Sequence, residues 1–461
     1  MRIDRLRVKN FRGFEDREFI FAGSPSNGSF HLLIGDNATG KTGVLEAIAV
    51  ALGSYTNVMP EAGKRHFQKR DIRVLLQAVG DTERIEPQLP TEIVAEGHVE
   101  AKPIKWTRRL KNKRVERAAD KAMREYAQSA LTRGRKDMSA VLPVICYFGT
   151  ERLHRHPKDV WSRDASFGET LIPKPVRKEG ARLYYEDKQF AQSRFVGYWF
   201  ANDARTSPEL LQRWLMVEHD LNRDRGFEAI QFQVVKEAMQ QCIVNCSGIK
   251  LDARLGLLVN IQNRGWLPFE LLSDGQKVIA AMVGELAWKA SQLNPILNRE
   301  VLTKSPGIVL IDELDLHLHP VWQRTIVEAL RTIFPRMQFI CTTHSPFIVQ
   351  TMREGELMSL DKETIPKTDN LSIAAIAKGL MGVEEISERI MGVMEPDASP
   401  RYNKMKQVAT DYLIELQEAK KAPAEKLEEY KRALAERIAP YADNPAFQAV
   451  LEMERITALG S

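Results

Sequence analysis

The sequence has 461 residues, of which 44% are hydrophobic and 28% are charged, an ordinary globular composition. Lys and Arg (66) exceed Asp and Glu (61) by five, too small an excess for a nucleic-acid coat protein. No apolar run approaches the roughly 20 residues that cross a bilayer, and the charged N-terminus does not resemble a signal peptide. The four cysteines form no zinc-binding pattern, so we expect a reduced, cytoplasmic protein without membrane contact.

Residues 30–52 (FHLLIGDNATGKTGVLEAIAVAL) combine a short apolar run, a glycine-rich loop and a segment with apolar residues at helical spacing. A phosphate-binding loop requires this order, because the backbone N–H groups of the loop and the helix N-terminus hold phosphate oxygens. We expect Lys41 to reach the β- and γ-phosphates of ATP, and the Thr42 hydroxyl to bind Mg²⁺. The predicted nucleotide contacts of the loop are Gly35, Asp36, Asn37, Ala38, Thr39, Gly40, Lys41 and Thr42.

Residues 102–117 (KPIKWTRRLKNKRVER) contain eight basic residues and one acidic residue, and a helical pattern runs from Val115 to Ala130. A solvated basic face explains this charge, and so does contact with DNA or an acidic partner. Further along the chain, residues 142–152 (LPVICYFGTER) have the pattern of a buried strand with a polar end. Residues 183–245 contain two helical patterns, which we expect to form a lobe on the nucleotide-binding domain.

Residues 271–288 (LLSDGQKVIAAMVGELAW) place a hydroxyl and a glycine directly before a long helical pattern. We expect Ser273 to cap this helix and Gly275 to allow the close approach of another backbone. Ser273 and the free N–H groups at the start of the helix together form an anion site. The stretch contains no catalytic base, no metal-ligand cluster and no nucleophile pair, so it is not expected to act alone.

A hydrophobic strand over residues 308–311 runs directly into Asp312 and Glu313. An aspartate at the end of a buried parallel strand is well placed to hold Mg²⁺. The adjacent Glu313 can then polarise a water molecule for in-line attack on the γ-phosphate. Acidic pairs after strands also cap helices, and the phosphate-binding loop in the same chain favours the functional interpretation.

The residues after this strand predict an amphipathic helix over 322–333 and another strand over 337–343. His317 and His319 lack further ligands nearby, and the leucines around them favour a packed turn over a metal site. His344 follows the strand at 337–343, where a histidine could contact the γ-phosphate or the attacking water.

Five motifs in this order resemble the ATP-binding-cassette heads of the SMC, Rad50 and RecF class of AAA-type ATPases. They are an opening strand at 6–14, the phosphate-binding loop, the signature motif at 272–276, the acidic strand with its turn, and Thr343-His344-Ser345. The resemblance implies an α/β fold with a mixed sheet and flanking helices. It assigns ATP contacts to Arg12, Ser273, Gly275 and Gln276, catalytic roles to Lys41, Glu313 and His344, and Mg²⁺ binding to Thr42 and Asp312.

In this class the signature motif binds the γ-phosphate held by a second subunit, so the resemblance implies a head-to-head dimer or a larger homo-oligomer. It also implies a nucleotide-sensing loop after the strand at 142–149, where Thr150 or Glu151 replaces the usual glutamine. The insertion between the loop and the signature is short and lacks heptads, which excludes a long-armed clamp. We expect four parts: head residues 1–100 and 251–365, an inserted basic and helical lobe at 101–250, and a helical C-terminal region at 366–461.

The residues after 350 contain two charged helical patterns, 405–416 and 426–438, and a final helix, but no Asp-x-Asp pair and no histidine. A Toprim or HNH nuclease centre is therefore not expected in this chain. The tail, the strand at 142–149 and the short insertion most resemble the ATPase subunit of Septu-type bacterial antiphage systems, which also accompanies some retrons. That resemblance implies a regulatory ATPase that controls a separate HNH-type nuclease subunit.

Two other functions are compatible with the sequence. A RecF-like DNA-binding ATPase of repair or recombination would use the basic residues 102–117, and a nucleotide-sensing scaffold would turn over little ATP. A transporter cassette is not expected, because the opening strand and the long C-terminal region do not fit one.

Overall fold

The computed structural model divides into two compact units, residues 1–386 and residues 387–461. The structure describes residues 1–21, 23, 28–60, 62–79, 82–111, 114–116, 118–150, 176–178, 182–184, 193–202, 204, 208–252, 255–360, 381–391, 400–420, 426–438 and 445–459. Glu151, most of the segment after it and the predicted domain boundary near 366 lie outside the described residues.

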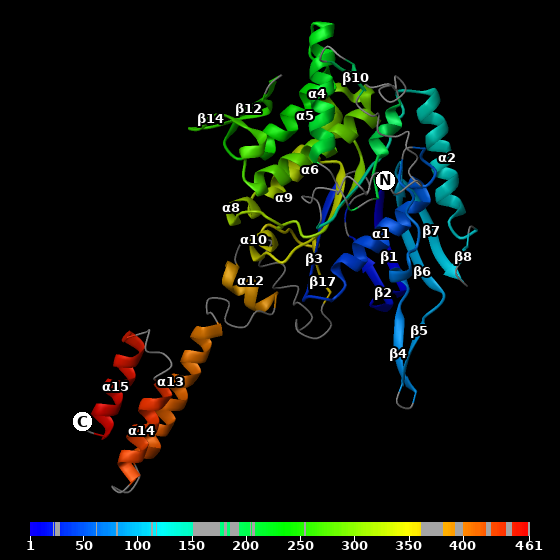
Figure 1. Cartoon of the computed structure of the whole chain (residues 1–461). Coiled ribbons are helices and arrows are strands. Elements are labelled where there is room, and N and C mark those ends of the chain that lie inside the picture. The colour runs from blue at the N-terminus through cyan, green and yellow to red at the C-terminus, as the bar shows by residue number, and fades with distance from the viewer. Residues whose placement is uncertain are drawn as a thin grey trace. The chain divides into compact units, whose positions relative to one another are not determined.

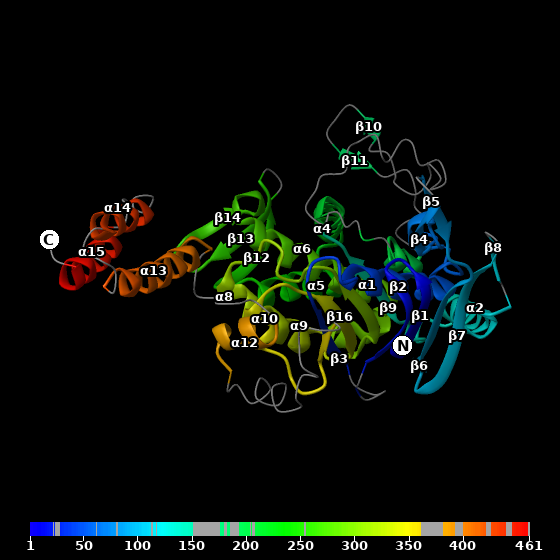
Figure 2. The same cartoon turned by 90° about the horizontal axis from the view of Figure 1, so that it is seen from below.

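The core of the first unit is a parallel five-stranded sheet with the strand order β17-β3-β16-β15-β9. Strands β3 and β17 of this sheet are labelled in Figure 1, and β9 and β16 in Figure 2. Its strands are β3 (Ser29–Ile34), β9 (Val144–Phe148), β15 (Gly307–Ile311), β16 (Met337–Thr342) and β17 (Leu357–Ser359). All but β17 are almost wholly buried, because a parallel sheet covered on both faces needs continuous apolar strands. The strands predicted at 30–34, 142–149, 308–311 and 337–343 are therefore confirmed.

A second sheet is antiparallel and has the order β2-β1-β6-β7-β8. Its strands are β1 (Arg2–Phe11), β2 (Phe14–Ile20), β6 (Thr91–Val99), β7 (Lys102–Lys111) and β8 (Arg114–Val115). The basic stretch thus continues the sheet by pairing with β6, whereas the sequence predicted that it opens an inserted lobe. The reason is its alternation: Trp106, Arg108 and Leu110 are buried, and the residues between them are more exposed.

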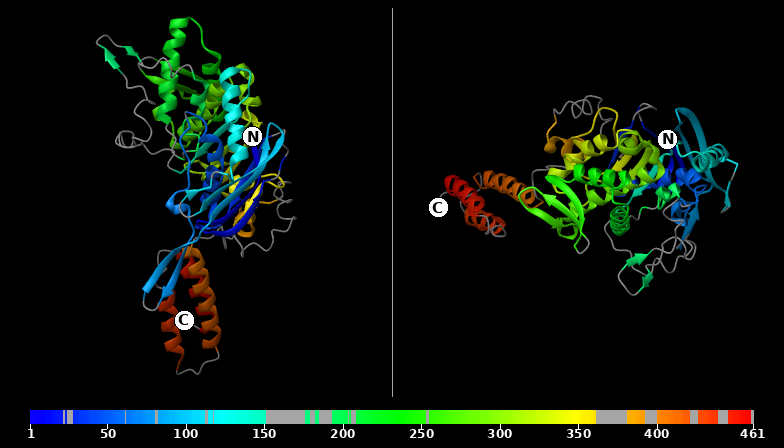
Figure 3. Two further views of the ribbon diagram at one scale, coloured as in Figure 1. Left: turned by 90° about the vertical axis from the view of Figure 1, so that its right-hand side faces the viewer. Right: turned by 90° about the horizontal axis from the view of Figure 1, so that it is seen from above.

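Helix α1 (Lys41–Thr56) follows the phosphate-binding loop and contacts β16 of the parallel sheet as well as β1, β6 and β7 of the antiparallel sheet. Nearly all of its residues are buried, because it packs against both sheets. Helix α2 (Lys121–Lys136) packs on α1 and β7 (Figure 3). It begins later than the helical pattern from Val115 predicted, because residues 114–115 pair with β7.

The two helical patterns predicted within 183–245 are confirmed as α4 (Pro208–Arg225) and α5 (Ile230–Cys242), which pack on α6 (Asp274–Leu293). The short helix η2 (Arg194–Tyr198) also contacts α6. There the buried Arg194 donates from Nε to the carbonyl oxygen of Leu293 at 2.8 Å. A three-stranded antiparallel sheet follows α5 and consists of β12 (Cys246–Asp252), β13 (Gly256–Ile261) and β14 (Gly265–Pro268) (Figure 2).

The helix predicted over 322–333 is divided into α8 (Pro320–Gln323) and α9 (Ile326–Ile333). At the break, Thr325 donates both its N–H and its hydroxyl to the carbonyl oxygen of Trp322, a local bond that competes with helical pairing. The remaining elements of this part of the chain are η1 (Lys69–Asp71), β4 (Val74–Val79), β5 (Thr82–Pro87), β10 (Val176–Lys178), β11 (Arg182–Tyr184), η3 (Phe269–Leu271), η4 (Pro295–Glu300), α7 (Val301–Lys304), α10 (Pro346–Val349) and α12 (Val383–Arg389).

The described residues of the second unit include the helices α13 (Pro400–Ala419), α14 (Leu427–Ile438) and α15 (Pro445–Leu459). They share a small core of Tyr412, Leu416, Leu434 and Leu451. The predicted hairpin of two charged helices and the final helix are therefore confirmed. None of the described helices is long and apolar enough to span a membrane.

Candidate nucleotide-binding site

The phosphate-binding loop joins the carboxyl end of β3 to the N-terminus of α1. Gly40 has a φ of 100°, and a Cβ atom there would lie 2.5 Å from Cζ of the Phe14 ring, so only glycine fits. Thr39 closes the turn by donating its N–H and its hydroxyl to the carbonyl oxygen of Asp36. The loop also includes Ala38, whose φ is 68°. The chain therefore turns sharply into the first turn of α1, whose free N–H groups form an anion site.

Lys41 is the first residue of α1 and directs its side chain back over this loop. Its Nζ donates to the carbonyl oxygens of Gly35 at 2.6 Å and Asp36 at 2.9 Å. These bonds hold the ammonium group within the loop, where a positive charge attracts phosphate oxygens.

Thr42 brings the phosphate-binding loop and the acidic strand together. Its Oγ1 donates to Oδ2 of Asp312 at 2.8 Å, and Asp312 is buried directly after β15. The other carboxylate oxygen, Oδ1, accepts a 2.7 Å hydrogen bond from Oγ1 of Thr342. The backbone N–H of Asp312 donates to the carbonyl oxygen of Phe148 at the end of β9. Three neighbouring strand ends thus fix the aspartate beside the first turn of α1.

Glu313 has a left-handed backbone conformation, with a φ of 49°. Its N–H donates to Oγ1 of Thr342 at 2.7 Å, so the same hydroxyl positions both acidic residues. A non-glycine residue in this conformation costs energy, and such strain clusters at functional sites. Thr342 was not predicted as a site residue from the sequence. Its place at the end of a predicted strand, directly before Thr343 and His344, could have indicated that it lies at the site.

Asp315 connects the turn after the acidic strand to His344, the predicted catalytic histidine. Its Oδ1 accepts hydrogen bonds from Oγ1 of Thr343 at 2.5 Å and from the backbone N–H of His344 at 3.2 Å. The His344 side chain itself is exposed. Asp315 therefore holds the backbone of His344 and leaves its imidazole accessible to a ligand.

The signature motif forms the N-terminus of α6, and Ser273 caps this helix as predicted. Oγ of Ser273 accepts from the N–H of Gln276, and Oε1 of Gln276 accepts from the N–H of Ser273. Gln276, which we predicted as an ATP contact, is thus half of a capping box. The side chain of Ser273 is exposed, so the cap does not close it off from solvent.

Gly275 lies against the turn that contains His317. A Cβ atom at Gly275 would lie 2.6 Å from the carbonyl oxygen of His317, so only glycine allows this approach. The turn is a packed one, as predicted, with His319 as the N-cap of α8. The start of the signature helix is therefore in direct contact with the loop that follows the acidic strand.

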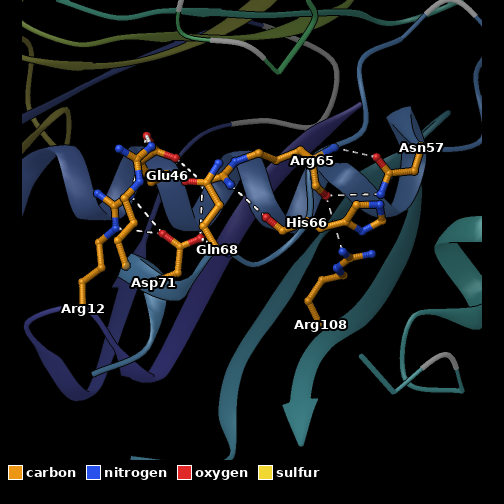
Figure 4. A network of polar contacts seen from close by, with 9 residues as sticks. Arg12, Glu46, Asn57, Arg65, His66, Gln68, Asp71 and Arg108 are labelled. Atoms are coloured by element: carbon orange, nitrogen blue, oxygen red, sulfur yellow. Dashed lines mark hydrogen bonds and ion pairs between the residues drawn. The ribbon is translucent and has the colours of Figure 1, made fainter. Parts of the chain in front are cut away.

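Arg12 lies beside α1 and not in the phosphate-binding loop itself. Its Nε donates to Oδ1 of Asp71 at 3.0 Å, and its Nη2 lies 3.7 Å from Oε1 of Glu46 on α1 (Figure 4). Asp71 and Glu46 were not singled out in the sequence, where they are isolated acidic residues without a recognisable motif.

Apart from Arg12, the predicted ATP contacts lie in the phosphate-binding loop and at two helix N-termini. Lys41 and Thr42 begin α1, and they meet Asp312. Ser273, Gly275 and Gln276 lie at the start of α6. In the predicted nucleotide-sensing loop, Thr150 is exposed and Glu151 lies outside the described residues. The nucleotide roles of all these residues stay predictions.

Two family models match the chain. An AAA domain model matches residues 5–194, and a second AAA domain model, whose description also names an AbiEii toxin and a type IV toxin–antitoxin system, matches residues 145–350. The chain is 24% identical to the Retron Vc95 probable ATPase of Vibrio cholerae, over 78% of this chain and 74% of that protein. It is 33% identical to the Septu protein PtuA of Bacillus thuringiensis, over 34% of this chain and 40% of that protein.

An SMC head domain from Thermotoga maritima aligns with 78% of this chain and 94% of its own, at 13% identity and a TM-score of 0.40. The chain spans less than half the length of the Septu relative, so the activity of that whole protein is not carried over. The two AAA domain models together match residues 5–350, which include the phosphate-binding loop and the acidic strand that Thr42 and Asp312 join, and the chain is similar to retron and Septu ATPases.

Proposed function

We propose that the chain binds ATP with Mg²⁺ at the phosphate-binding loop and hydrolyses it. The observation that carries the proposal is the 2.8 Å hydrogen bond between Thr42 and Asp312, which joins motifs 270 positions apart. A hydroxyl and a carboxylate beside a helix N-terminus are hard oxygen donors of the kind that Mg²⁺ prefers. The residues therefore fit the ion that accompanies ATP in such sites.

Each residue of the site has a distinct role in this proposal. Lys41 and the N–H groups of the loop hold the β- and γ-phosphates, and Thr42 and Asp312 hold the metal. Bound Mg²⁺ supplies positive charge that stabilises the phosphate oxygens during transfer. Glu313 accepts the proton of the attacking water, and His344 binds the γ-phosphate. Thr342 positions Asp312 and Glu313 relative to one another.

The signature motif serves a second copy of the chain in this proposal. Ser273 and the N-terminus of α6 form an exposed anion site, which would take the γ-phosphate bound by the partner head. Each ATP would then be held between two heads, so that nucleotide controls assembly into dimers or larger oligomers.

The ATPase would regulate a separate HNH-type nuclease in a bacterial antiphage defence complex. The similarity to a retron ATPase over 78% of this chain, and to a Septu protein over a shorter stretch, supports this assignment. The three-helix second unit is our proposed contact for a partner or for oligomerisation. In this proposal the chain is not itself a nuclease.

A RecF-like role in DNA binding receives less support. Three of the five basic residues of β7 form ion pairs within the chain: Lys105 pairs with Glu96 at 2.7 Å, and Arg108 with Asp120 at 3.1 Å. Arg109 also forms an ion pair with Glu92. These three side chains are therefore less available to a phosphate backbone than the charge of the stretch suggests.

Three measurements test the proposal. Lys41→Ala should abolish ATP binding, and unchanged nucleotide affinity would refute the site. Ser273→Arg should bind ATP but not dimerise, so ATP-dependent dimers of this variant would exclude the shared site. Glu313→Gln should release phosphate more slowly than the wild type, and equal rates would favour a scaffold that does not turn over ATP.

The regulatory role is tested by copurification from the native locus. A nuclease subunit should copurify with the ATPase, and the purified ATPase alone should cut no DNA. Metal-dependent cutting by this chain alone would contradict the proposal.

A further inference from the structure

A buried cluster of charged residues surrounds Arg12 on one side of α1 (Figure 4). Glu46 lies on α1, one turn beyond Thr42, and the segment after α1 brings Arg65 and Asp71 to the same side. Asp71 is wholly buried, and Glu46 and Arg65 are each 7% exposed. Ionisable side chains this deeply buried need defined partners.

Asp71 lies between two guanidinium groups. Its Oδ1 accepts the hydrogen bond from Nε of Arg12, and its Oδ2 lies 3.5 Å from Nη2 of Arg65. Oδ2 also accepts a 2.9 Å hydrogen bond from the N–H of Gln68. Arg65 forms a second ion pair, with Glu46. The two carboxylates and the two guanidiniums therefore balance in charge, and Arg70 adds a more exposed positive charge 3.5 Å from Glu46.

The backbone of Arg12 is fixed as firmly as its side chain. The residue has a φ of 47°, and its N–H donates to the carbonyl oxygen of Asp71 at 3.0 Å. Phe11 and Ile72 form an antiparallel bridge next to this bond. The opening strand and the segment that carries Asp71 are thus joined at Arg12.

This arrangement sets the Arg12 side chain next to the phosphate-binding loop. Its Cδ lies 3.8 Å from the position that a Cβ of Gly43 would take, two residues after Lys41. Burial and the nearby carboxylates of Glu46 and Asp312 raise the pKa of Tyr147. Within the described part of the chain, Nη2 of Arg12 is buried and makes no hydrogen bond, although it contacts both carboxylates as ion pairs.

We propose that Asp71 and Glu46 are positioning residues that hold Arg12 beside the first turn of α1, where its guanidinium can bind a phosphate of ATP. The inference rests on the proposed ATP site. Arginine presents several N–H donors in a rigid fork, so it can bind a carboxylate and a phosphate at once. A fixed ion pair also removes much of the entropy cost of ordering this long side chain when nucleotide binds. Arg65 and Arg70 together keep the cluster from becoming net acidic, which would repel the phosphates.

Asp71→Asn tests the proposal because it keeps the shape of the side chain and removes its charge. Asp120→Asn is the matched control: Asp120 is also buried and pairs with Arg108 at 3.1 Å and Arg124 at 2.7 Å. Both variants should lower the midpoint of thermal unfolding. Only Asp71→Asn should also weaken Mg²⁺–ATP binding, by on the order of tenfold in isothermal titration. Equal ATP affinity in the two variants would overturn the proposal.

A double-mutant cycle separates positioning from a general loss of stability. In the Arg12→Ala background, Asp71→Asn should weaken ATP binding no further, because its effect acts through Arg12. A second, independent loss of affinity would overturn the proposal.

Arg12→Lys provides a test if Asp71→Asn does not fold. A lysine keeps the charge but cannot bind a carboxylate and a phosphate together, so we expect a similar loss of ATP affinity. Wild-type affinity in this variant would refute positioning. If Lys41→Ala leaves ATP binding intact, the proposed ATP site is refuted. If Lys41→Ala abolishes ATP binding and Arg12→Lys leaves it unchanged, the ATP site stands and only the positioning role of Asp71 and Glu46 is refuted.

Discussion

Replacing Gly275 by alanine should separate the start of α6 from the turn after the acidic strand. The new Cβ would lie 2.6 Å from the carbonyl oxygen of His317 and 3.6 Å from Cα of Leu318. A backbone oxygen does not rotate aside as a flexible side chain does, so the two segments must move apart by roughly 0.7 Å to reach an ordinary C···O contact. Overpacking of this kind costs about 1–3 kcal/mol, and the better helix propensity of alanine offsets up to about 1 kcal/mol. We expect the free energy of unfolding to fall by roughly 1–2 kcal/mol.

Urea unfolding followed by tryptophan fluorescence measures this loss, since Trp288 lies on α6. Gly13→Ala is the matched control, because a Cβ atom at Gly13 would meet no heavy atom within 4 Å. The control should unfold like the wild type. If Gly275→Ala were as stable as Gly13→Ala, the close contact with His317 would not constrain the helix.

The same variant also tests how the signature motif acts. Under the proposed function, Gly275→Ala displaces the anion site of α6 but leaves Lys41 and the loop in place. The affinity of the monomer for ATP should therefore stay unchanged, and the ATP-dependent dimer should dissociate more readily in analytical ultracentrifugation. If Gly275→Ala lost ATP affinity and kept the dimer, the assignment of ATP binding to the start of α1 and of dimer formation to the start of α6 would be refuted.

Three further predictions concern other parts of the first unit. Arg194→Met should lower the free energy of unfolding in urea by roughly 3 kcal/mol, because the carbonyl oxygen of Leu293 loses its charged donors. Arg133→Met, which removes an exposed ion pair, is the control and should cost less than about 1 kcal/mol in the same urea titration. Burial lowers the pKa of His31 from 6.5 to about 4, so between these pH values the unfolded chain binds more protons than the folded chain. The midpoint of thermal unfolding should therefore fall as the pH falls from 6.5 to 4, and His31→Gln should remove this part of the pH dependence. Asp312→Asn should weaken Mg²⁺ binding in the presence of ATP by at least about tenfold, and an unchanged Mg²⁺ titration would contradict its role as a ligand.

Much of the fold was predictable because its signals are local. The apolar runs at 30–34 and 308–311 are long enough only for strands, and they are the buried strands of the parallel sheet. Ser273 precedes a helical pattern and has glutamine three residues later, so the cap of α6 could be read from the sequence. Such features depend on neighbours within a few positions, where the sequence alone defines the geometry.

The errors occurred where a pattern had two interpretations. Residues 102–117 read as a basic segment, but burial of Trp106 and Arg108 against the core makes 102–111 a strand of the antiparallel sheet. The pattern over 322–333 reads as one helix, but Thr325 binds the backbone three residues earlier and divides it. In both cases a contact or a local hydrogen bond outweighed the pattern.

By itself, the sequence determined the phosphate-binding loop, the acidic strand, the capped signature helix and their order, because each is a short continuous motif. Only the tertiary structure decided that Thr42 meets Asp312, that Thr342 positions both acidic residues, and that Gly275 approaches His317. The cluster around Arg12 also comes from the fold, since Glu46, Arg65 and Asp71 form no motif in the chain. Contacts between residues far apart in the sequence depend on how the strands and helices pack, and no local pattern records that packing.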